Sequence, residues 1–180
     1  MEYLDIYDSE GKPLGMRIPK KEAHDKGLWH RAAHVWIVNS GGEVLIQRHS
    51  PFIDNYPNAW DISAAGHVSA GEDDITSAVR ETEEEIGLKI PPGDFVFIGT
   101  VKQMTAREGY INNEINPVYV VRKDLDVTQL KKQAEEVSDV NFIPLVELQR
   151  MVAAKDPSLV PHPDEFTLLF SYLNKMVAPK

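Results

Sequence analysis

Carboxylate side chains are concentrated in one short stretch of the chain, residues 66–88. This stretch contains seven acidic residues and one basic residue, Arg80, so it holds a net charge of −6 out of the chain's −9. The acidic residues are Glu72, Asp73, Asp74, Glu81, Glu83, Glu84 and Glu85. Carboxylate oxygens are the preferred ligands of hard divalent cations such as Mg²⁺, Mn²⁺ or Ca²⁺. The stretch therefore predicts a divalent-metal site, and the alternative is a solvated acidic helix face.

Helical geometry favours the metal site over the solvated face. Residues 74–86 have the spacing of an amphipathic helix. Its apolar stripe would consist of Ile75, Ala78, Val79, Thr82 and Ile86. Glu81, Glu84 and Glu85 then share the opposite half, where like charges three or four residues apart destabilise a helix by about 0.2–0.5 kcal/mol per pair. Because Arg80 is the one basic residue of the helix, a bound cation explains this face better than water does.

Signals at both ends delimit this helix. Asp73 is suited to the N-cap, and Gly87 is suited to the left-handed conformation that ends many helices. In the preceding turn, Gly66 and Gly71 permit backbone conformations that other residues rarely adopt. We therefore expect this turn to direct a backbone carbonyl at the same cation.

The rest of the chain predicts the strands and helices that must position this segment. We expect a β-hairpin at about 2–18, a second hairpin from 32–38 and 43–47, and a short strand at 60–65. Strands follow at 95–104, 115–121 and 137–142, and two closing helices lie within 144–177, at 144–155 and 164–176. Segments 19–28, 51–58 and 106–113 are predicted to be irregular loops. Strands interspersed with helices indicate an α/β domain with helices on both faces of a mixed sheet.

The overall composition restricts the class of protein. The chain has 180 residues, 42% apolar and 26% charged, which fits a single folded domain over residues 1–180. A net charge of −9 argues against binding a nucleic acid polymer or an anionic membrane. No apolar run reaches the roughly 20 residues of a membrane helix, and the first ten residues lack a signal-peptide pattern, so we expect a cytoplasmic protein. The oligomeric state stays open, with a homodimer among the possibilities.

The acidic segment resembles the signature of the Nudix hydrolase family, Gly-x5-Glu-x7-Arg-Glu-U-x-Glu-Glu-x-Gly-U, in which U is aliphatic. Seven fixed identities match, namely Gly66, Glu72, Arg80, Glu81, Glu84, Glu85 and Gly87, and Leu88 matches one aliphatic position. Chance agreement is on the order of one in 10⁸ per window. Thr82 departs from the pattern at the other aliphatic position. Because Thr82 lies on the predicted buried stripe, we expect this departure to change packing rather than catalysis.

The resemblance implies roles for these residues. Glu81, Glu84 and Glu85 would be metal ligands, with the Gly66 carbonyl as a further ligand. Glu72 would be an auxiliary ligand or would support the ligands without touching the metal, and Arg80 would orient Glu81 through a bidentate contact. The family's fold is an α/β/α sandwich around a mixed sheet, and its general reaction is hydrolysis of a diphosphate linked to another group. The implied cofactor is Mg²⁺, with Mn²⁺ as the alternative, and the implied partner is a small diphosphate.

Four further segments are similar to the Nudix subgroup related to isopentenyl-diphosphate isomerase: residues 29–32, 58–63, 65–67 and 113–118. In that isomerase a cysteine precedes the residue matching Gly66. Histidines matching His67 and His30, and less closely His24, bind a metal together with two glutamates. The second of these glutamates matches Glu114 and also transfers protons.

This chain departs from the isomerase pattern at two positions. Ala65 stands in place of the cysteine, and Asn112 stands in place of the first glutamate. The sequence contains no cysteine at all, which also excludes disulfides and thiolate metal sites. A methyl group cannot deliver a proton, so isomerase chemistry is disfavoured.

Several single residues are candidates outside the acidic segment. Glu114 is a candidate general base, and Glu135-Glu136 are weaker alternatives. Arg48 is a candidate phosphate ligand, and Trp60 is a candidate wall of the pocket. His67 and His30 are either metal or phosphate ligands or hydrogen-bonded structural residues, with neither favoured. We assign structural or surface roles to His24, His34, His49 and His162.

Three functional hypotheses follow from these residues. The first is a Mg²⁺-dependent Nudix pyrophosphohydrolase acting on a nucleotide-type or isoprenoid-type diphosphate. The second is an isomerase that retains the subgroup's reaction, and the third is a non-catalytic domain that binds a diphosphate or a partner protein. The loops at 51–58 and 106–113 are expected to select the substrate.

Overall fold

The computed structural model describes residues 1–177, in which nine strands form one mixed sheet. The strands are β1 (Tyr3–Tyr7), β2 (Pro13–Pro19), β3 (Trp29–Val38), β4 (Glu43–His49), β5 (Trp60–Asp61), β6 (Ala64–His67), β7 (Phe95–Arg107), β8 (Tyr110–Arg122) and β9 (Val137–Pro144). The helices are α1 (Lys20–Asp25), α2 (Asp74–Ile86), α3 (Leu145–Ala153) and α4 (Pro163–Val177), with short 3₁₀ turns at Pro92–Asp94 and Val127–Gln129. No helix in this part of the chain has the length and apolar character needed to cross a membrane.

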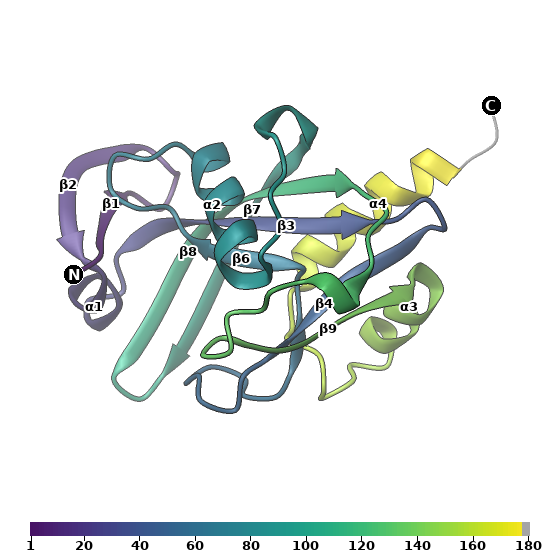
Figure 1. Cartoon of the computed structure of the whole chain (residues 1–180). Coiled ribbons are helices and arrows are strands. Elements are labelled where there is room, and N and C mark those ends of the chain that lie inside the picture. The colour runs from purple at the N-terminus through teal and green to yellow at the C-terminus, as the bar shows by residue number, and fades with distance from the viewer. Residues whose placement is uncertain (178–180) are drawn as a thin grey trace.

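The long strand β3 organises the sheet (Figure 1). It pairs in parallel with β8, from Trp29↔Asn113 to Val38↔Arg122, and antiparallel with β1, β4 and β6. Residues 32–38 of β3 are all buried, as expected for a strand covered on both faces. The sheet is therefore mixed, as the sequence predicted.

Helices cover both faces of the sheet (Figure 1). Successive side chains of β3 point to opposite faces, so this strand contributes apolar side chains to the core on each side. Ala33, Val35 and Ile37 face a core that includes Ala78 and Ile86 of α2. Trp36 and Val38 face the other core, which includes Phe166, Leu169 and Leu173 of α4 and Leu148 of α3. The predicted α/β fold with helices on both faces is confirmed.

The central helix α2 has the predicted bounds and the predicted ends. The Asp73 side chain accepts a hydrogen bond from the Thr76 backbone N–H at 2.8 Å, and Gly87 is left-handed with φ of 69°. Thr82 is fully buried and donates its hydroxyl to the Ala78 carbonyl at 2.7 Å. This hydrogen bond satisfies the one polar side chain on the apolar stripe, so the departure at Thr82 is accommodated by packing.

Two segments predicted to be loops are regular instead. Residues 106–113 complete the β7–β8 hairpin, whose strands pair up to Arg107↔Tyr110 and turn at Gly109. Asn112 lies on this extension and faces a cavity rather than the core. A polar residue therefore stands at an inward-facing position, and the alternation of apolar and polar residues that predicts a strand is lost. Residues 20–25 form the short helix α1, which buries Ala23 and His24.

Candidate functional site

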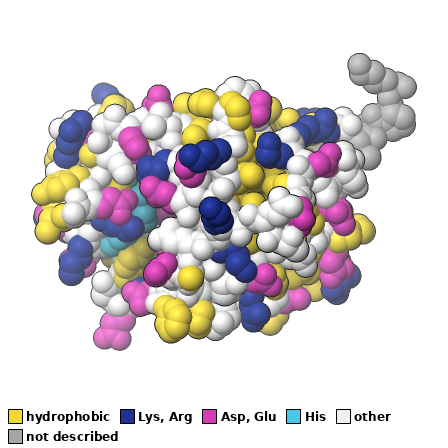
Figure 2. All heavy atoms as spheres, viewed as in Figure 1, with side chains coloured by type: hydrophobic (Ala, Val, Ile, Leu, Met, Phe, Trp, Pro, Cys, Tyr) yellow, Lys and Arg dark blue, Asp and Glu magenta, His cyan; other side chains and the backbone are white. Residues whose placement is uncertain are grey.

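A cavity of about 650 Å³ opens between α2, β4, β5, β6 and the β7–β8 hairpin. Its lining contains four glutamates from α2 and the preceding turn, a group of histidines near Glu114, and a polar wall around Asp61. Figure 2 shows histidine side chains in a hollow with charged side chains around it. The three groups differ in their chemistry.

Glu85 is the most buried of these four glutamates, with 4% of its surface exposed. One carboxylate oxygen accepts hydrogen bonds from the Ala65 backbone N–H at 2.9 Å and from Gln47 at 3.1 Å. Burial raises the pKa of Glu85 well above its ordinary value, and the nearby Glu81 charge adds to this effect. The carboxylate is therefore held in place without a full countercharge.

Glu81 lies one helical turn before Glu85 and packs against the backbone of Gly66. A Cβ atom at position 66 would lie 2.0 Å from the Glu81 carboxyl carbon, so only glycine fits there. Burial raises the pKa of Glu81 to about 7, although the Arg80 charge acts in the opposite direction. The glycine thus leaves room for a desolvated carboxylate beside the β6 backbone.

Arg80 holds the glutamates together. Its Nη1 donates to Glu81 at 2.6 Å and to Glu84 at 3.1 Å, and its Nε and Nη2 form a fork on Glu72 at 3.2 Å and 3.0 Å. Nη2 also donates to the His67 backbone carbonyl at 3.0 Å. The bidentate contact predicted for Glu81 is therefore made to Glu72 instead, because Glu72 faces the guanidinium edge while Glu81 reaches a single nitrogen.

The four glutamates fit a divalent cation. Arg80 is shared among Glu72, Glu81 and Glu84, and the pKa values of Glu81 and Glu85 are raised because burial is not balanced by positive charge. A cation at this position would supply the missing charge and favour ionised carboxylates. The donor set is composed of oxygen atoms, which suits Mg²⁺ or Mn²⁺.

His24, His30 and His67 form a second potential ligand set. One ring nitrogen from each lies within 4.8 Å of the others, and none of the three Nε2 atoms has a hydrogen-bond partner in residues 1–177 although all are buried. His30 Nδ1 lies 2.9 Å from the Leu28 carbonyl, an acceptor, so Nδ1 donates a proton to it and Nε2 is the nitrogen that faces the cluster without a partner. Burial lowers the pKa of His24 to about 4 and the pKa of His67 well below its ordinary value. The three imidazoles thus bring ring nitrogens close enough together to bind one metal ion.

Glu114 lies beside this cluster. Its Oε1 is 3.8 Å from His67 Nε2 and 4.0 Å from His30 Nε2, and the side chain lines the cavity. Glu136 also lines the cavity, whereas Glu135 does not. The carboxylate of Glu114 can therefore serve either as a fourth ligand of the histidine cluster or as a proton acceptor inside the cavity.

The polar wall centres on Asp61, which bonds two histidines. Asp61 lies 2.7 Å from His162 Nε2 and 3.0 Å from His49 Nε2, and His162 Nδ1 contacts Gln103 Oε1 at 2.9 Å. Burial disfavours charge on His162, but the Asp61 carboxylate outweighs this and raises the pKa of His162 to about 9. His34, also on the cavity wall, bonds Glu165 of α4 at 2.7 Å. These contacts tie the base of the cavity to α4.

Comparison with known proteins identifies the family. The family model described as the NUDIX domain matches residues 28–165. The chain belongs to the Nudix family. The matched region contains Glu72, Glu81, Glu84 and Glu85, so the glutamates beside the cavity are part of the Nudix domain.

Related Nudix proteins are named as hydrolases or isomerases. Nudix hydrolase 3 of Arabidopsis thaliana is 39% identical over 166 residues, which cover 89% of this chain but 22% of the plant protein. An uncharacterized Nudix hydrolase of Clostridium acetobutylicum is 34% identical, covering 86% of this chain and 75% of that protein. An isopentenyl-diphosphate Delta-isomerase of Escherichia coli is 27% identical, and the match covers 85% of this chain and 82% of the isomerase. The chain is thus an enzyme of the Nudix hydrolase family with isomerase relatives.

Solved structures show the same fold. The protein DR0079 from Deinococcus radiodurans superposes with a TM-score of 0.67 at 20% identity, covering 98% of this chain and all of that chain. The NUDIX domain of Shewanella oneidensis NrtR, solved with ADP ribose, superposes with a TM-score of 0.59 at 16% identity, covering 79% and 86%. These similarities extend the Nudix assignment from sequence to architecture.

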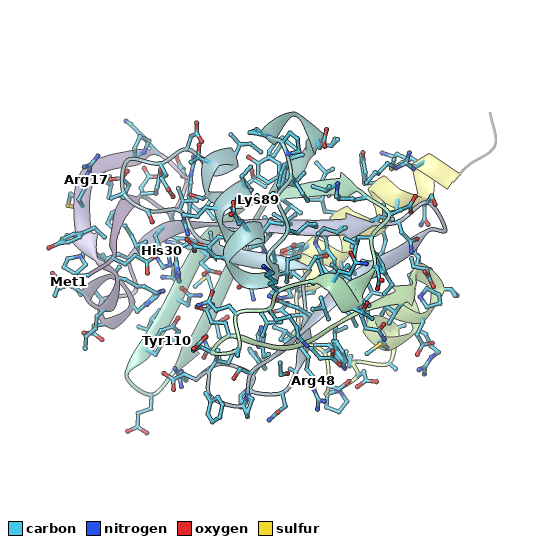
Figure 3. The ribbon with its side chains drawn as sticks, viewed as in Figure 1. Met1, Arg17, His30, Arg48, Lys89 and Tyr110 are labelled. Carbon is cyan, nitrogen blue, oxygen red and sulfur yellow. The ribbon has the colours of Figure 1, made fainter. Side chains whose placement is uncertain are left out.

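Two of the predicted substrate-binding residues do not line the cavity of this Nudix fold. Gln47 of β4 points toward Glu85, so its neighbour Arg48 projects from the opposite face of the strand. Arg48 is exposed, donates to the Asn58 carbonyl at 3.0 Å and lies over the Trp60 ring at 5.9 Å. Figure 3 shows Arg48 well apart from His30. This placement does not support a role for Arg48 or Trp60 in substrate binding at the cavity.

Several residues of the site lack a signal in the sequence. His34, His49 and His162, which we predicted to be structural or surface residues, have no such signal, whereas the isomerase resemblance implied a metal-binding role for His24, which joins the histidine cluster. His34, His49 and His162 line the cavity. Asp61 and Gln103 also line it. Their segments are distant along the chain, so no local spacing could group them.

Proposed function

We propose that this Nudix protein hydrolyses a diphosphate linked to another group and that the reaction depends on Mg²⁺. The observation that carries the proposal is the pair of desolvated carboxylates, Glu81 and Glu85, beside a cavity of about 650 Å³. A cation at this place would meet the phosphate oxygens of a substrate that enters the cavity.

Each residue has a role in this proposal. Glu81, Glu84, Glu85 and the Gly66 carbonyl would hold the cation, and Arg80 would fix the directions of Glu81 and Glu84. When bound, the cation neutralises phosphate charge and makes a bound water more acidic. We assign the general base to Glu114, because its buried carboxylate lines the same cavity. It would take a proton from the attacking water.

The similar proteins define which substrates to test. The Shewanella NUDIX domain was solved with ADP ribose, and the Escherichia coli relative is named for isopentenyl diphosphate. We therefore include nucleotide-type and isoprenoid-type diphosphates in one panel. The expected cytoplasmic location and homodimer stay predictions.

The test is release of phosphate or of a monophosphate from this panel, with and without Mg²⁺. Glu84→Gln and Glu85→Gln should each lose about 10²-fold or more in rate, because each removes charge from the metal site. Glu83→Gln is the matched control on the same helix: Glu83 pairs with Lys89 at 2.9 Å and does not line the cavity. Wild-type turnover in Glu84→Gln and Glu85→Gln would overturn the proposal, and tight binding without turnover would indicate a non-catalytic binding domain.

The histidine cluster favours isomerisation as a second candidate. His24, His30 and His67, with Glu114 beside them, retain most of the metal ligands that the isomerase resemblance implies. Ala65 lies at the cavity wall where that resemblance implies a proton donor, and its methyl group has no proton to give. We therefore place hydrolysis first.

A further inference from the structure

One wall of the cavity carries a chain of three hydrogen-bonded side chains from distant parts of the sequence. Asp61 of β5 bonds His162, which directly precedes α4, and His162 bonds Gln103 of β7. The two distances are 2.7 Å and 2.9 Å, and His162 is 7% exposed. The proposed hydrolysis does not use any of these side chains.

The chain fixes the orientation of the Gln103 carboxamide. Nε2 of His162 faces an Asp61 carboxylate oxygen, and Nδ1 faces Oε1 of Gln103, so each ring nitrogen donates to an acceptor. The pKa of His162, raised to about 9 by Asp61, agrees with a ring that carries both protons. The NH₂ group of Gln103 is thereby turned away from His162, and it donates no hydrogen bond to the part of the chain that the structure describes. Gln103 lines the cavity, so this donor is available to a bound molecule.

Gln103 also lies where two cavities meet. A second cavity of about 540 Å³, at the free edge of β7 and the start of α4, shares Tyr56, Gln103, Thr105 and His162 with the first. A molecule whose diphosphate lies near the glutamates can extend past Gln103 toward this second cavity. The shared residues are therefore placed to contact the group attached to the diphosphate.

We propose that Gln103 is a specificity-determining residue that donates a hydrogen bond to an oxygen of the group attached to the diphosphate, with His162 and Asp61 as positioning residues. This inference rests on the proposed function and adds the character of the substrate. A group that bears hydroxyl or carbonyl oxygens satisfies the fixed donor. A hydrocarbon chain leaves it unpaired, which disfavours isoprenoid diphosphates.

The experiment compares UDP-glucose, a nucleoside diphosphate sugar, with isopentenyl diphosphate. Dissociation constants are measured by calorimetry with Ca²⁺ in place of Mg²⁺, and kcat and KM are measured with Mg²⁺. Wild-type protein should bind UDP-glucose at least about 10-fold more tightly than isopentenyl diphosphate. Preference for isopentenyl diphosphate, or no binding of either, would overturn the inference.

Two variants at position 103 separate recognition from structural support. Gln103→Leu removes the donor and the bond to His162. Gln103→Glu keeps an oxygen bonded to His162 but replaces the NH₂ donor by an acceptor, so a merely structural role would survive it. Both variants should weaken UDP-glucose binding about 10-fold or more, and KM should change more than kcat. Isopentenyl diphosphate binding should change less than about twofold. Retained selectivity in Gln103→Glu, or equal weakening for both ligands, would contradict the assignment.

His162 and an exposed glutamine supply the remaining comparisons. His162→Leu should reproduce the loss of selectivity, because it releases the carboxamide. Gln129→Leu is the matched control, since Gln129 is exposed and lines neither cavity. Selective binding of UDP-glucose without hydrolysis would overturn the proposed hydrolase and leave the role of Gln103 supported. Hydrolysis whose kcat, KM and substrate preference are unchanged in the Gln103 variants would support the proposed hydrolase and overturn the role of Gln103.

Discussion

The Glu81 carboxylate occupies the space that a side chain at position 66 would need. A Cβ atom on Gly66 would lie 2.0 Å from Cδ of Glu81 and 2.3 Å from both of its oxygens. The φ angle of Gly66 is not in the left-handed region, so close packing rather than backbone conformation requires glycine here. The glycine of β6 and the glutamate of α2 thus define one boundary of the proposed metal site.

Gly66→Ala should displace Glu81 and lower the Mg²⁺-dependent hydrolysis rate about 10²-fold, because a metal ligand is moved. Gly93→Ala is the control, since an added Cβ there meets nothing within 4 Å. Rates are measured with the best substrate of the panel, and circular dichroism checks the fold. Unchanged activity in Gly66→Ala would argue against Glu81 as a ligand.

The Asp61–His162 pair should make stability depend on pH. Burial opposes the charge on His162, but Asp61 outweighs it, and the pKa is raised from 6.5 to about 9. Because the folded ring holds its proton more tightly, the stabilisation is complete below pH 6.5 and is lost as the pH rises through about 9. We expect the free energy of unfolding in urea to fall by on the order of 3 kcal/mol across this range.

The control for this pH dependence is His162→Gln, which cannot bind the proton. Its free energy of unfolding should be lower than that of the wild type near pH 6 and should change less toward pH 9. Identical pH slopes in the two proteins would show that the pair does not titrate in this range. His34 keeps its own partner, Glu165, in both proteins, whereas His49 shares Asp61 with His162, so the difference reports the two histidines that contact Asp61.

The histidine cluster should bind a transition metal independently of the glutamates. Three histidines whose Nε2 atoms are unpaired, and whose ring nitrogens lie within 4.8 Å of one another, suit Zn²⁺ or Co²⁺. Titration with Co²⁺, followed by its visible absorption, should show a site that His30→Asn weakens about 10²-fold. His49→Asn, whose ring nitrogens already contact Asp61 and the Tyr56 carbonyl, should leave it unchanged, as should Glu85→Gln. Loss of the Co²⁺ spectrum in Glu85→Gln alone would place the ion elsewhere.

Ala65 should prevent isomerisation. Its backbone N–H donates to Glu85 at 2.9 Å, and its side chain is a methyl group at the cavity wall. Isopentenyl diphosphate incubated with the enzyme in D₂O should therefore incorporate no deuterium, as followed by NMR. Incorporation above a heat-inactivated control would restore isomerisation as the leading function.

The sequence was sufficient for the central helix because its signals are local. Asp73, Gly87 and the apolar stripe between them lie within one continuous stretch that also contains Glu81, Glu84 and Glu85, so helical spacing alone places these three glutamates on one side. The tip of the β7–β8 hairpin was missed because Asn112 is a polar residue that faces the cavity. Inward polarity of this kind reverses the usual strand pattern.

The remainder of the site depends on contacts between distant segments. His162 meets Gln103 from 59 residues away and Asp61 from 101 residues away. Nothing near any of these positions in the sequence indicates the others. The direction of the Arg48 side chain could not be predicted because strand alternation gives two choices, and only the contact of Gln47 with Glu85 shows which one is taken.

The most direct test of metal binding by the glutamates is anomalous diffraction from crystals soaked in Mn²⁺. We predict an anomalous peak between Glu81, Glu85 and the Gly66 carbonyl in the wild type. The peak should be lost in Glu85→Gln and should remain in Glu83→Gln. Glutamates that remain paired with Arg80 and show no peak beside them, even at saturating Mn²⁺, would contradict a metal-dependent site on α2.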